Sequence, residues 1–223
     1  MKTLGIIGGI GPESTIVYYR AIVAGFRERV RDGSLPPIII NSIDMKKLLD
    51  LVASDRPALT TFLSDEVERL ARAGADVALF ASNTPHIVFN DVQQRSRIPL
   101  LSIVDATRRA VAARGLRKPA LFGIRFTMQG RFYPDEFVIP DHSDQEVIHS
   151  IYVNELLKNI FLDKSRATLT AIIDRLKSTH NIDSVILGGT ELPLLLTDET
   201  AAGMPLLATS RIHASEALEE ILR

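Results

Sequence analysis

The sequence has no cysteine among its 223 residues. This absence excludes disulfide bridges, thiolate metal ligands and catalysis by a thiol. Charge of one sign is also lacking, because 26 basic and 27 acidic side chains leave a net charge of -1. Neither nucleic acid nor a membrane surface is therefore indicated as a partner. Apolar runs such as 36–40 are too short to span a bilayer, and the N-terminus lacks the pattern of a signal peptide. We expect a cytoplasmic protein.

Short apolar segments alternate with amphipathic ones along the chain. The pattern predicts strands at 3–8, 38–41, 77–81, 120–123 and 184–187. It predicts helices at 13–31, 57–73, 103–114, 144–161, 166–179 and 210–222, with a short one opening at Pro85. This alternation is typical of an α/β fold in which parallel sheets are covered on both faces. Right-handed crossovers then place the functional loops at the carboxyl ends of the strands.

A weak internal repeat is present. Segment 76–84 resembles 183–191, since each has an aspartate, an apolar strand and a small polar cluster. Segment 4–8 likewise resembles 120–124, at an offset close to half the chain. The repeat predicts two similar α/β halves, although buried strands of unrelated origin also look alike.

The glycine cluster at 5–12 follows a predicted strand and precedes a helix. It is not a dinucleotide motif, because Ser14 stands where the third glycine is needed and no acidic residue ends the second strand. A P-loop is excluded as well, because no Lys-Ser/Thr pair follows. Two interpretations stay open: backbone N–H groups around Gly9 and Gly11 that suit a carboxylate, or a simple packing turn.

Two other strands end in polar clusters. Ser82-Asn83-Thr84-Pro85-His86 follows one of them, and can bind a carboxylate or serve only as a helix cap. His86 taken alone is more often a structural hydrogen-bonding residue than a base.

The corresponding cluster in the second half is Gly188-Gly189-Thr190-Glu191. Glu191 can act as an acid or base, or can simply favour the first turn of a helix. The five histidines show no tight metal spacing, so no metal site is predicted. A hydrolase triad is not indicated either, because no Gly-x-Ser-x-Gly motif is present.

Taken together, the motifs resemble those of the cofactor-independent aspartate/glutamate racemases, within the Asp/Glu/hydantoin racemase superfamily. The resemblance runs nearly end to end and in order. It is carried by the segments 8–15 with Tyr18-Tyr19, 41–44, 82–86, 123–128 and 188–191.

This resemblance implies two four-stranded parallel α/β domains related by a pseudo-two-fold, with the site at their interface. The first domain is expected at 1–101 plus 207–223, because the C-terminal helix returns to it, and the second at 102–206. Neither pyridoxal phosphate nor a metal is expected, and dimers are common in the family, which predicts a homodimer. The expected ligand is a small acidic amino acid or a dicarboxylate.

In the family, two cysteines flank the substrate α-carbon, so that one thiolate removes the α-proton and the other thiol delivers a proton to the opposite face. A stereocentre can be inverted only by a base and an acid on opposite sides. By resemblance, the predicted substrate-binding residues are Gly9, Gly11, Ser14, Asn83, Thr84, Arg125 and Thr127.

The sequence departs from the family at both catalytic positions. Ser82 stands where the first cysteine belongs and Gly189 where the second belongs. Three interpretations remain: a racemase that uses substitutes such as Thr190, Glu191 or His86, a ligand-binding protein without catalysis, and a lyase or isomerase with new chemistry. We expect Ser82→Cys combined with Gly189→Cys to create racemisation.

Overall fold

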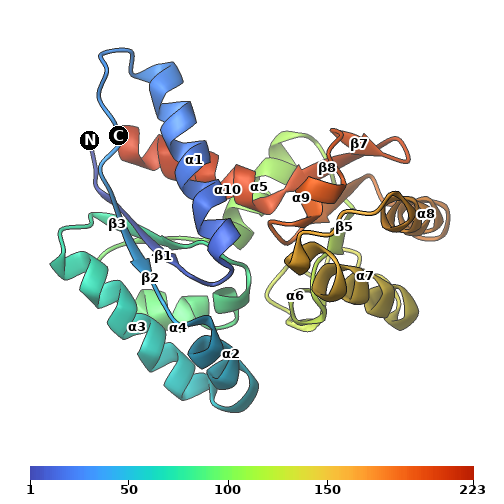
Figure 1. The fold of residues 1–223 in the computed structure, drawn as a ribbon, viewed down its shortest axis with the longest axis horizontal. Helices are drawn as coiled ribbons and strands as arrows, with labels where there is room; N and C mark the ends of the chain where they lie inside the picture. The colour runs from blue at the N-terminus through green and yellow to red at the C-terminus, as the bar shows by residue number, and fades with distance from the viewer. The chain divides into compact units, whose positions relative to one another are not determined.

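The structure is a computed structural model that describes residues 1–223 apart from the side chain of Pro12. The chain divides into two compact units. Unit 1 comprises Met1–Ala106 and Ser210–Arg223, and unit 2 comprises Thr107–Thr209. Each unit contains its own sheet, and the predicted α/β class is confirmed (Figure 1).

Unit 1 is built on a four-stranded parallel sheet with the order β2-β1-β3-β4. Its elements are β1 (Leu4–Gly8), α1 (Pro12–Arg29), β2 (Ile38–Ser42), α2 (Met45–Ser54), α3 (Arg56–Arg72), β3 (Val77–Phe80), the 3₁₀ helix η1 (Thr84–Val88), α4 (Phe89–Arg95) and β4 (Leu100–Leu101). The final helix, α10 (Thr209–Leu222), returns to this unit.

Helices cover both faces of the first sheet. Alternate residues of β1 point to opposite sides, so Ile6 packs under α1 and α10 while Ile7 packs under α2, α3 and α4. Figure 1 shows α1 and α10 together on one side of these strands and α2, α3 and α4 on the other. Because both faces are buried, the strands read in the sequence as continuous apolar runs.

Unit 2 has the strand order β5-β6-β8-β7, in which only the short edge strand β7 is antiparallel. Its elements are β5 (Pro119–Phe122), α6 (Arg125–Gln129), α7 (His142–Asn154), the 3₁₀ helix η2 (Leu156–Lys158), α8 (Asp163–His180), β6 (Ser184–Leu187), α9 (Leu192–Leu195), β7 (Thr200–Ala201) and β8 (Met204–Ala208). The remaining helix, α5 (Ile103–Ala113), contains the boundary between the two units.

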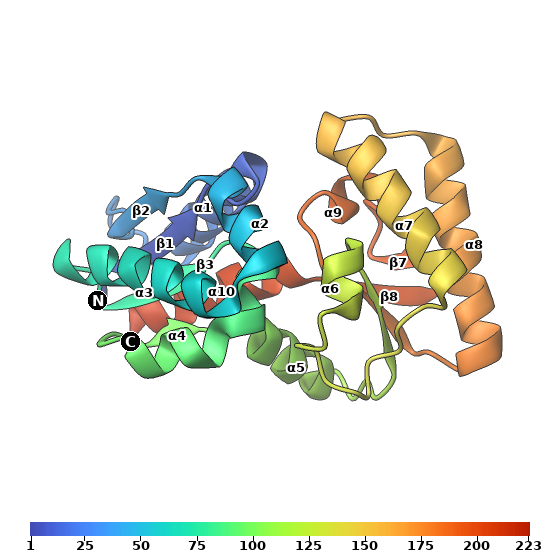
Figure 2. The same cartoon turned by 90° about the horizontal axis from the view of Figure 1, so that it is seen from below.

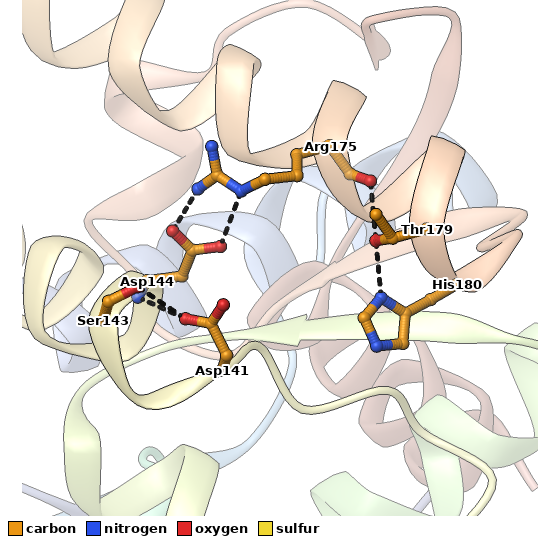
Figure 3. A network of polar contacts seen from close by, with 6 residues as sticks. All are labelled: Asp141, Ser143, Asp144, Arg175, Thr179 and His180. Carbon is orange, nitrogen blue, oxygen red and sulfur yellow. Dashed lines mark hydrogen bonds and ion pairs between the residues drawn. The ribbon is translucent and has the colours of Figure 1, made fainter.

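Helices α7 and α8 lie side by side on one face of the second sheet (Figure 2). The Asp141 side chain caps α7 by accepting from the backbone N–H of Asp144 at 2.9 Å. Asp144 in turn receives two hydrogen bonds from the guanidinium of Arg175 on α8 (Figure 3). This network fixes α7, which carries a residue of the candidate site.

Several elements differ from the sequence prediction. Helix α2 was not expected, although Asp44 caps it by accepting from Lys46 N–H at 2.8 Å. Strand β8 contains Pro205, a residue that argues against a strand. It pairs with β7 through a tight turn in which Ala202 and Gly203 both have positive φ. Prediction of one helix over 144–161 was wrong, because α7 ends at Asn154 and η2 follows.

Candidate functional site

The glycine loop after β1 is pressed against the end of β2. An ideal Cβ on Gly9 would lie 2.4 Å from the carbonyl oxygen of Ile43, and Gly9 has φ 81°, so only glycine fits. Its N–H donates to the Thr15 hydroxyl at 3.0 Å. Gly11 also has φ 81° and caps α1 without a side-chain hydrogen bond. The amide of Gly9 is therefore already used within the loop.

Ser14 is buried on the first turn of α1. Its hydroxyl donates to the carbonyl oxygen of Ala81, the residue that follows β3. The structure thus ties the glycine loop to the strand end that precedes Ser82. In this geometry the Ser14 proton is committed to the backbone, which favours a positioning role over direct contact with a ligand.

His86 has both ring nitrogens occupied by backbone groups. Nε2 accepts from Ile103 N–H at 3.0 Å, so the proton of the neutral ring is on Nδ1, which donates to the Ser82 carbonyl at 3.1 Å. The ring stacks on Phe89 at 5.1 Å between centroids and is 5% exposed. Burial lowers the pKa of His86 to about 4. The imidazole therefore holds the turn after β3 and is poorly placed to act as a base.

Ser82 is half-buried at the carboxyl end of β3, and Asn83 and Thr84 beside it are buried. Among the residues that the structure describes, the Ser82 hydroxyl has no hydrogen-bond partner. A serine becomes a strong base or nucleophile only when an adjacent group removes its proton, and His86 is occupied elsewhere. Ser82 is thus placed to donate a hydrogen bond to a ligand.

The end of β6 carries the second cluster. An ideal Cβ on Gly189 would lie 2.3 Å from the hydroxyl oxygen of Tyr152 on α7, so the tyrosine occupies the place of a side chain there. The Tyr152 hydroxyl donates to Oε2 of Glu191, and the Thr190 hydroxyl donates to the same atom at 2.8 Å. Burial, followed by the charge of Glu191, raises the pKa of Tyr152 well above its usual value.

Arg125 and Thr127 lie on α6, directly after β5. The Arg125 guanidinium forms two hydrogen bonds to Glu146 on α7, one of them 2.7 Å from Nε to Oε1. Thr127 is buried, and its side chain lies 3.0 Å from where a Cβ on Gly123 would be and 3.1 Å from where one on Gly188 would be. It fills the space between the ends of β5 and β6.

The structure therefore brings the predicted residues together in two groups. One group lies at the end of β3 in unit 1, and the other lies at the ends of β5 and β6 in unit 2. Sequence reasoning missed Tyr152 and Glu146. Tyr152 follows Ile148 and Ile151 at helical spacing, so the sequence presents it as an ordinary core residue.

In the described part of the chain, no group of three or more His, Cys, Asp or Glu side chains is placed to hold a metal ion. Among the described helices, none has both the length and the apolar character needed to cross a membrane.

Comparison with known proteins identifies relatives of the whole chain. The profile of the Asp/Glu/hydantoin racemase family matches residues 7–217. A candidate Asp/Glu racemase from Yersinia pestis superposes with a TM-score of 0.94 at 34% identity, covering 100% of both chains. An aspartate racemase homologue from Pyrococcus horikoshii OT3 superposes with a TM-score of 0.88 at 32% identity, again covering 100% of both chains. The broad specificity amino-acid racemase of Bacillus subtilis (strain 168) is 23% identical, covering 98% of each chain. From its glycine loop to its last helix, this chain belongs to the Asp/Glu/hydantoin racemase family.

Proposed function

We propose that the protein binds a small acidic amino acid or dicarboxylate, and that the family's two-thiol racemisation has been lost. The candidates for contact with the ligand are the polar strand ends 82–84 in unit 1 and 189–191 in unit 2, each taken within its own unit. The observation that carries this proposal is the position of Tyr152. Its hydroxyl oxygen would be 2.3 Å from a Cβ at position 189, so a cysteine fits there only if the Tyr152 side chain shifts.

The strand end around residue 189 fits the absence of a side chain there. Glycine at 189 accommodates the tyrosine, and Glu191 accepts the tyrosine hydroxyl.

The polar groups at these strand ends suit an acidic amino acid. The Ser82 hydroxyl, which has no hydrogen-bond partner among the described residues, is a donor for a carboxylate. The Glu191 carboxylate, 6% exposed and next to the partly exposed Thr190, is an acceptor for an ammonium group. Because Glu191 would repel a second carboxylate brought close to it, we expect amino acids to bind better than plain dicarboxylates.

Isothermal titration calorimetry with L- and D-aspartate, L- and D-glutamate and succinate tests the proposal. The expected result is saturable binding of at least one amino acid, with succinate weaker. Chiral chromatography of the same mixtures should show no inverted product. The absence of binding for all five compounds, with the protein folded by circular dichroism, would contradict ligand binding, and an inverted product would contradict the loss of racemisation.

Ser82→Ala is the matched variant for the first strand end, because it removes only the hydroxyl. We expect it to weaken binding by about 10- to 100-fold, the effect of one hydrogen bond to a charged group. Ser34→Ala, in a distant exposed turn, makes the same chemical change and should leave the affinity unaltered. The homodimer stays a prediction, which light scattering of the purified protein would test.

A further inference from the structure

We propose that Tyr152 is a catalytic residue at the strand end 189–191 of unit 2, acting as a hydroxyl that passes a proton between the ligand α-carbon and Glu191. This inference rests on the proposed function, because it needs an amino acid bound at the same strand end.

The Tyr152 hydroxyl lies close to where a side chain at position 189 would be. A cysteine at position 189 would project its sulfur from the point that the Tyr152 oxygen nearly occupies, 2.3 Å from the Cβ position. The hydroxyl comes from α7 and lies beside the position that a side chain at residue 189, after β6, would take. Tyr152 is only 6% exposed, but Gly189 has no side chain to cover its hydroxyl, and Gly189 and Thr190 are partly exposed.

The hydrogen bonds of Tyr152 connect it to the Glu191 carboxylate. Tyr152 gives its proton to Oε2 of Glu191, and its oxygen accepts from the backbone N–H of Glu191. Because the Thr190 hydroxyl donates to Glu191, a second lone pair of the phenol oxygen is left to accept from a ligand. A group that donates to a carboxylate while it accepts from a ligand is arranged as a relay. The raised pKa of Tyr152 means that the phenol is neutral at rest, so it needs the carboxylate to receive its proton.

The step balances within these groups. The Cα–H bond of the bound amino acid breaks, and its proton forms a new O–H bond on Tyr152. At the same time the original O–H bond of Tyr152 breaks and that proton bonds to Glu191. The electron pair of the C–H bond stays on the ligand as an enolate-like anion, and the reverse transfer returns a proton to the carbon.

A route to solvent is also present. Thr190 donates to the same Glu191 oxygen at 2.8 Å, and it is partly exposed while Glu191 is buried. Its hydroxyl can therefore exchange the Glu191 proton for one from water. In D₂O the α-carbon therefore receives a deuteron instead of its original proton.

A relay on one face of the carbon has a specific stereochemical result. The proton is removed and returned on the same side, so the α-position exchanges with retention of configuration. Only the enantiomer whose α-hydrogen faces Tyr152 reacts. A two-base racemase would instead exchange both enantiomers and invert them.

The experiment is proton NMR of L- and D-aspartate and L- and D-glutamate in D₂O with the intact protein, followed by chiral chromatography. For a given amino acid we expect loss of the α-proton signal from one enantiomer only, without inversion. Tyr152→Phe keeps the ring and removes the hydroxyl, and should lower the exchange rate at least about 100-fold while calorimetry still shows binding. Glu191→Gln, which keeps the shape but cannot take the proton, should also lower the exchange rate at saturating ligand, with weaker binding because the ammonium group loses its charged acceptor.

Tyr19→Phe, at a 44% exposed position on α1, is the matched control and should exchange at the wild-type rate. Wild-type protein that binds an amino acid and exchanges neither enantiomer overturns the relay and leaves the proposed function standing. Exchange that persists in Tyr152→Phe or in Glu191→Gln also overturns it. If no amino acid binds at all, the proposed function fails first, and the relay fails with it.

Discussion

The Tyr152 side chain occupies the space that a side chain at Gly189 would need. The hydroxyl oxygen of Tyr152 lies 2.3 Å, and two of its ring carbons lie 2.5 and 2.7 Å, from where a Cβ on residue 189 would be. Real Cβ atoms essentially never make contacts this short. A side chain can therefore be added at residue 189 only if Tyr152 moves or is replaced by a smaller residue. Gly189 is therefore explained by packing, independently of any chemistry.

Gly189→Ala should lower the free energy of unfolding by about 1–3 kcal/mol, because overpacking a filled site displaces its neighbours. Combining it with Tyr152→Leu, which removes the ring atoms that clash, should recover part of that loss. Urea denaturation of the two single variants and the double variant gives the coupling energy. Strictly additive losses would show that the two residues do not compete for this space.

The same contact bears on a prediction from the sequence that remains untested. Ser82→Cys with Gly189→Cys was expected to create racemisation, but the second cysteine fits only if Tyr152 shifts. We now expect that double variant to stay inactive. Only the triple variant that adds Tyr152→Ala should invert aspartate or glutamate, as polarimetry or chiral chromatography would detect. Inversion by the double variant would mean that Tyr152 moves aside easily, and Ser82→Cys alone is the control for a single thiol.

Much of the fold could be predicted from the sequence, because buried parallel strands read as short apolar runs. Val77–Phe80 and Ser184–Leu187 are examples, and the polar clusters singled out in the sequence follow directly after each of them. Tyr152 could not be predicted, because the contact that gives it meaning joins residues 37 positions apart on a helix and a strand end. Likewise, His86 has a suggestive place in a motif, but only the structure shows that backbone groups occupy both of its nitrogens.

Arg125 and Glu146 give a second prediction about binding. The Arg125 guanidinium is paired with Glu146, so a ligand carboxylate must compete for it. Glu146→Gln removes that competitor and should tighten binding of an acidic amino acid by about two- to fivefold, the range of an exposed ion pair. The gain should shrink in high salt, because Arg125 is 44% exposed.

Calorimetry at low and high ionic strength measures both effects of Glu146→Gln. Glu136→Gln is the matched control, since it removes the same charge from an exposed position in unit 2. Equal affinities for wild type and Glu146→Gln at low salt would remove Arg125 from the ligand site.

Because His86 is buried with a lowered pKa, we expect unit 1 to become less stable in acid. Its pKa is about 4 in the folded protein and 6.5 for an ordinary histidine, so between those values the unfolded chain binds the extra proton. The stability from this site is therefore complete above pH 6.5 and decreases as the pH falls toward 4. Between pH 7 and pH 5 the free energy of unfolding should fall by about 2 kcal/mol through His86 alone.

His86→Gln isolates this contribution, because glutamine can accept from Ile103 N–H and does not titrate. The difference between the urea midpoints at pH 7 and pH 5 should be smaller in the variant than in the wild type. Carboxylates that titrate in this range are common to both proteins and cancel. An equal pH dependence in the two proteins would show that protonation of His86 does not lower the free energy of unfolding.

The Asp144–Arg175 pair determines how firmly α7, and with it Tyr152, is held against α8. Asp144 has a side chain only 6% exposed and accepts two hydrogen bonds from Arg175, whose own side chain is 51% exposed (Figure 3). Arg175→Met keeps the aliphatic packing but leaves a buried carboxylate without its cation, so we expect a loss of about 2 kcal/mol from the free energy of unfolding.

Arg166→Met on the same helix is the matched control, because Arg166 pairs with the fully exposed Asp163 at 4.0 Å and should contribute less than about 0.5 kcal/mol. Chemical denaturation of both variants measures the contrast. Equal losses would mean that the burial of the Asp144 carboxylate does not make its pair with Arg175 more stabilising than an exposed ion pair. If Arg175→Met exchanges α-protons more slowly at full ligand saturation, the position of α7 also matters for the Tyr152 relay, since Arg175 is joined to α7 by its hydrogen bonds to Asp144.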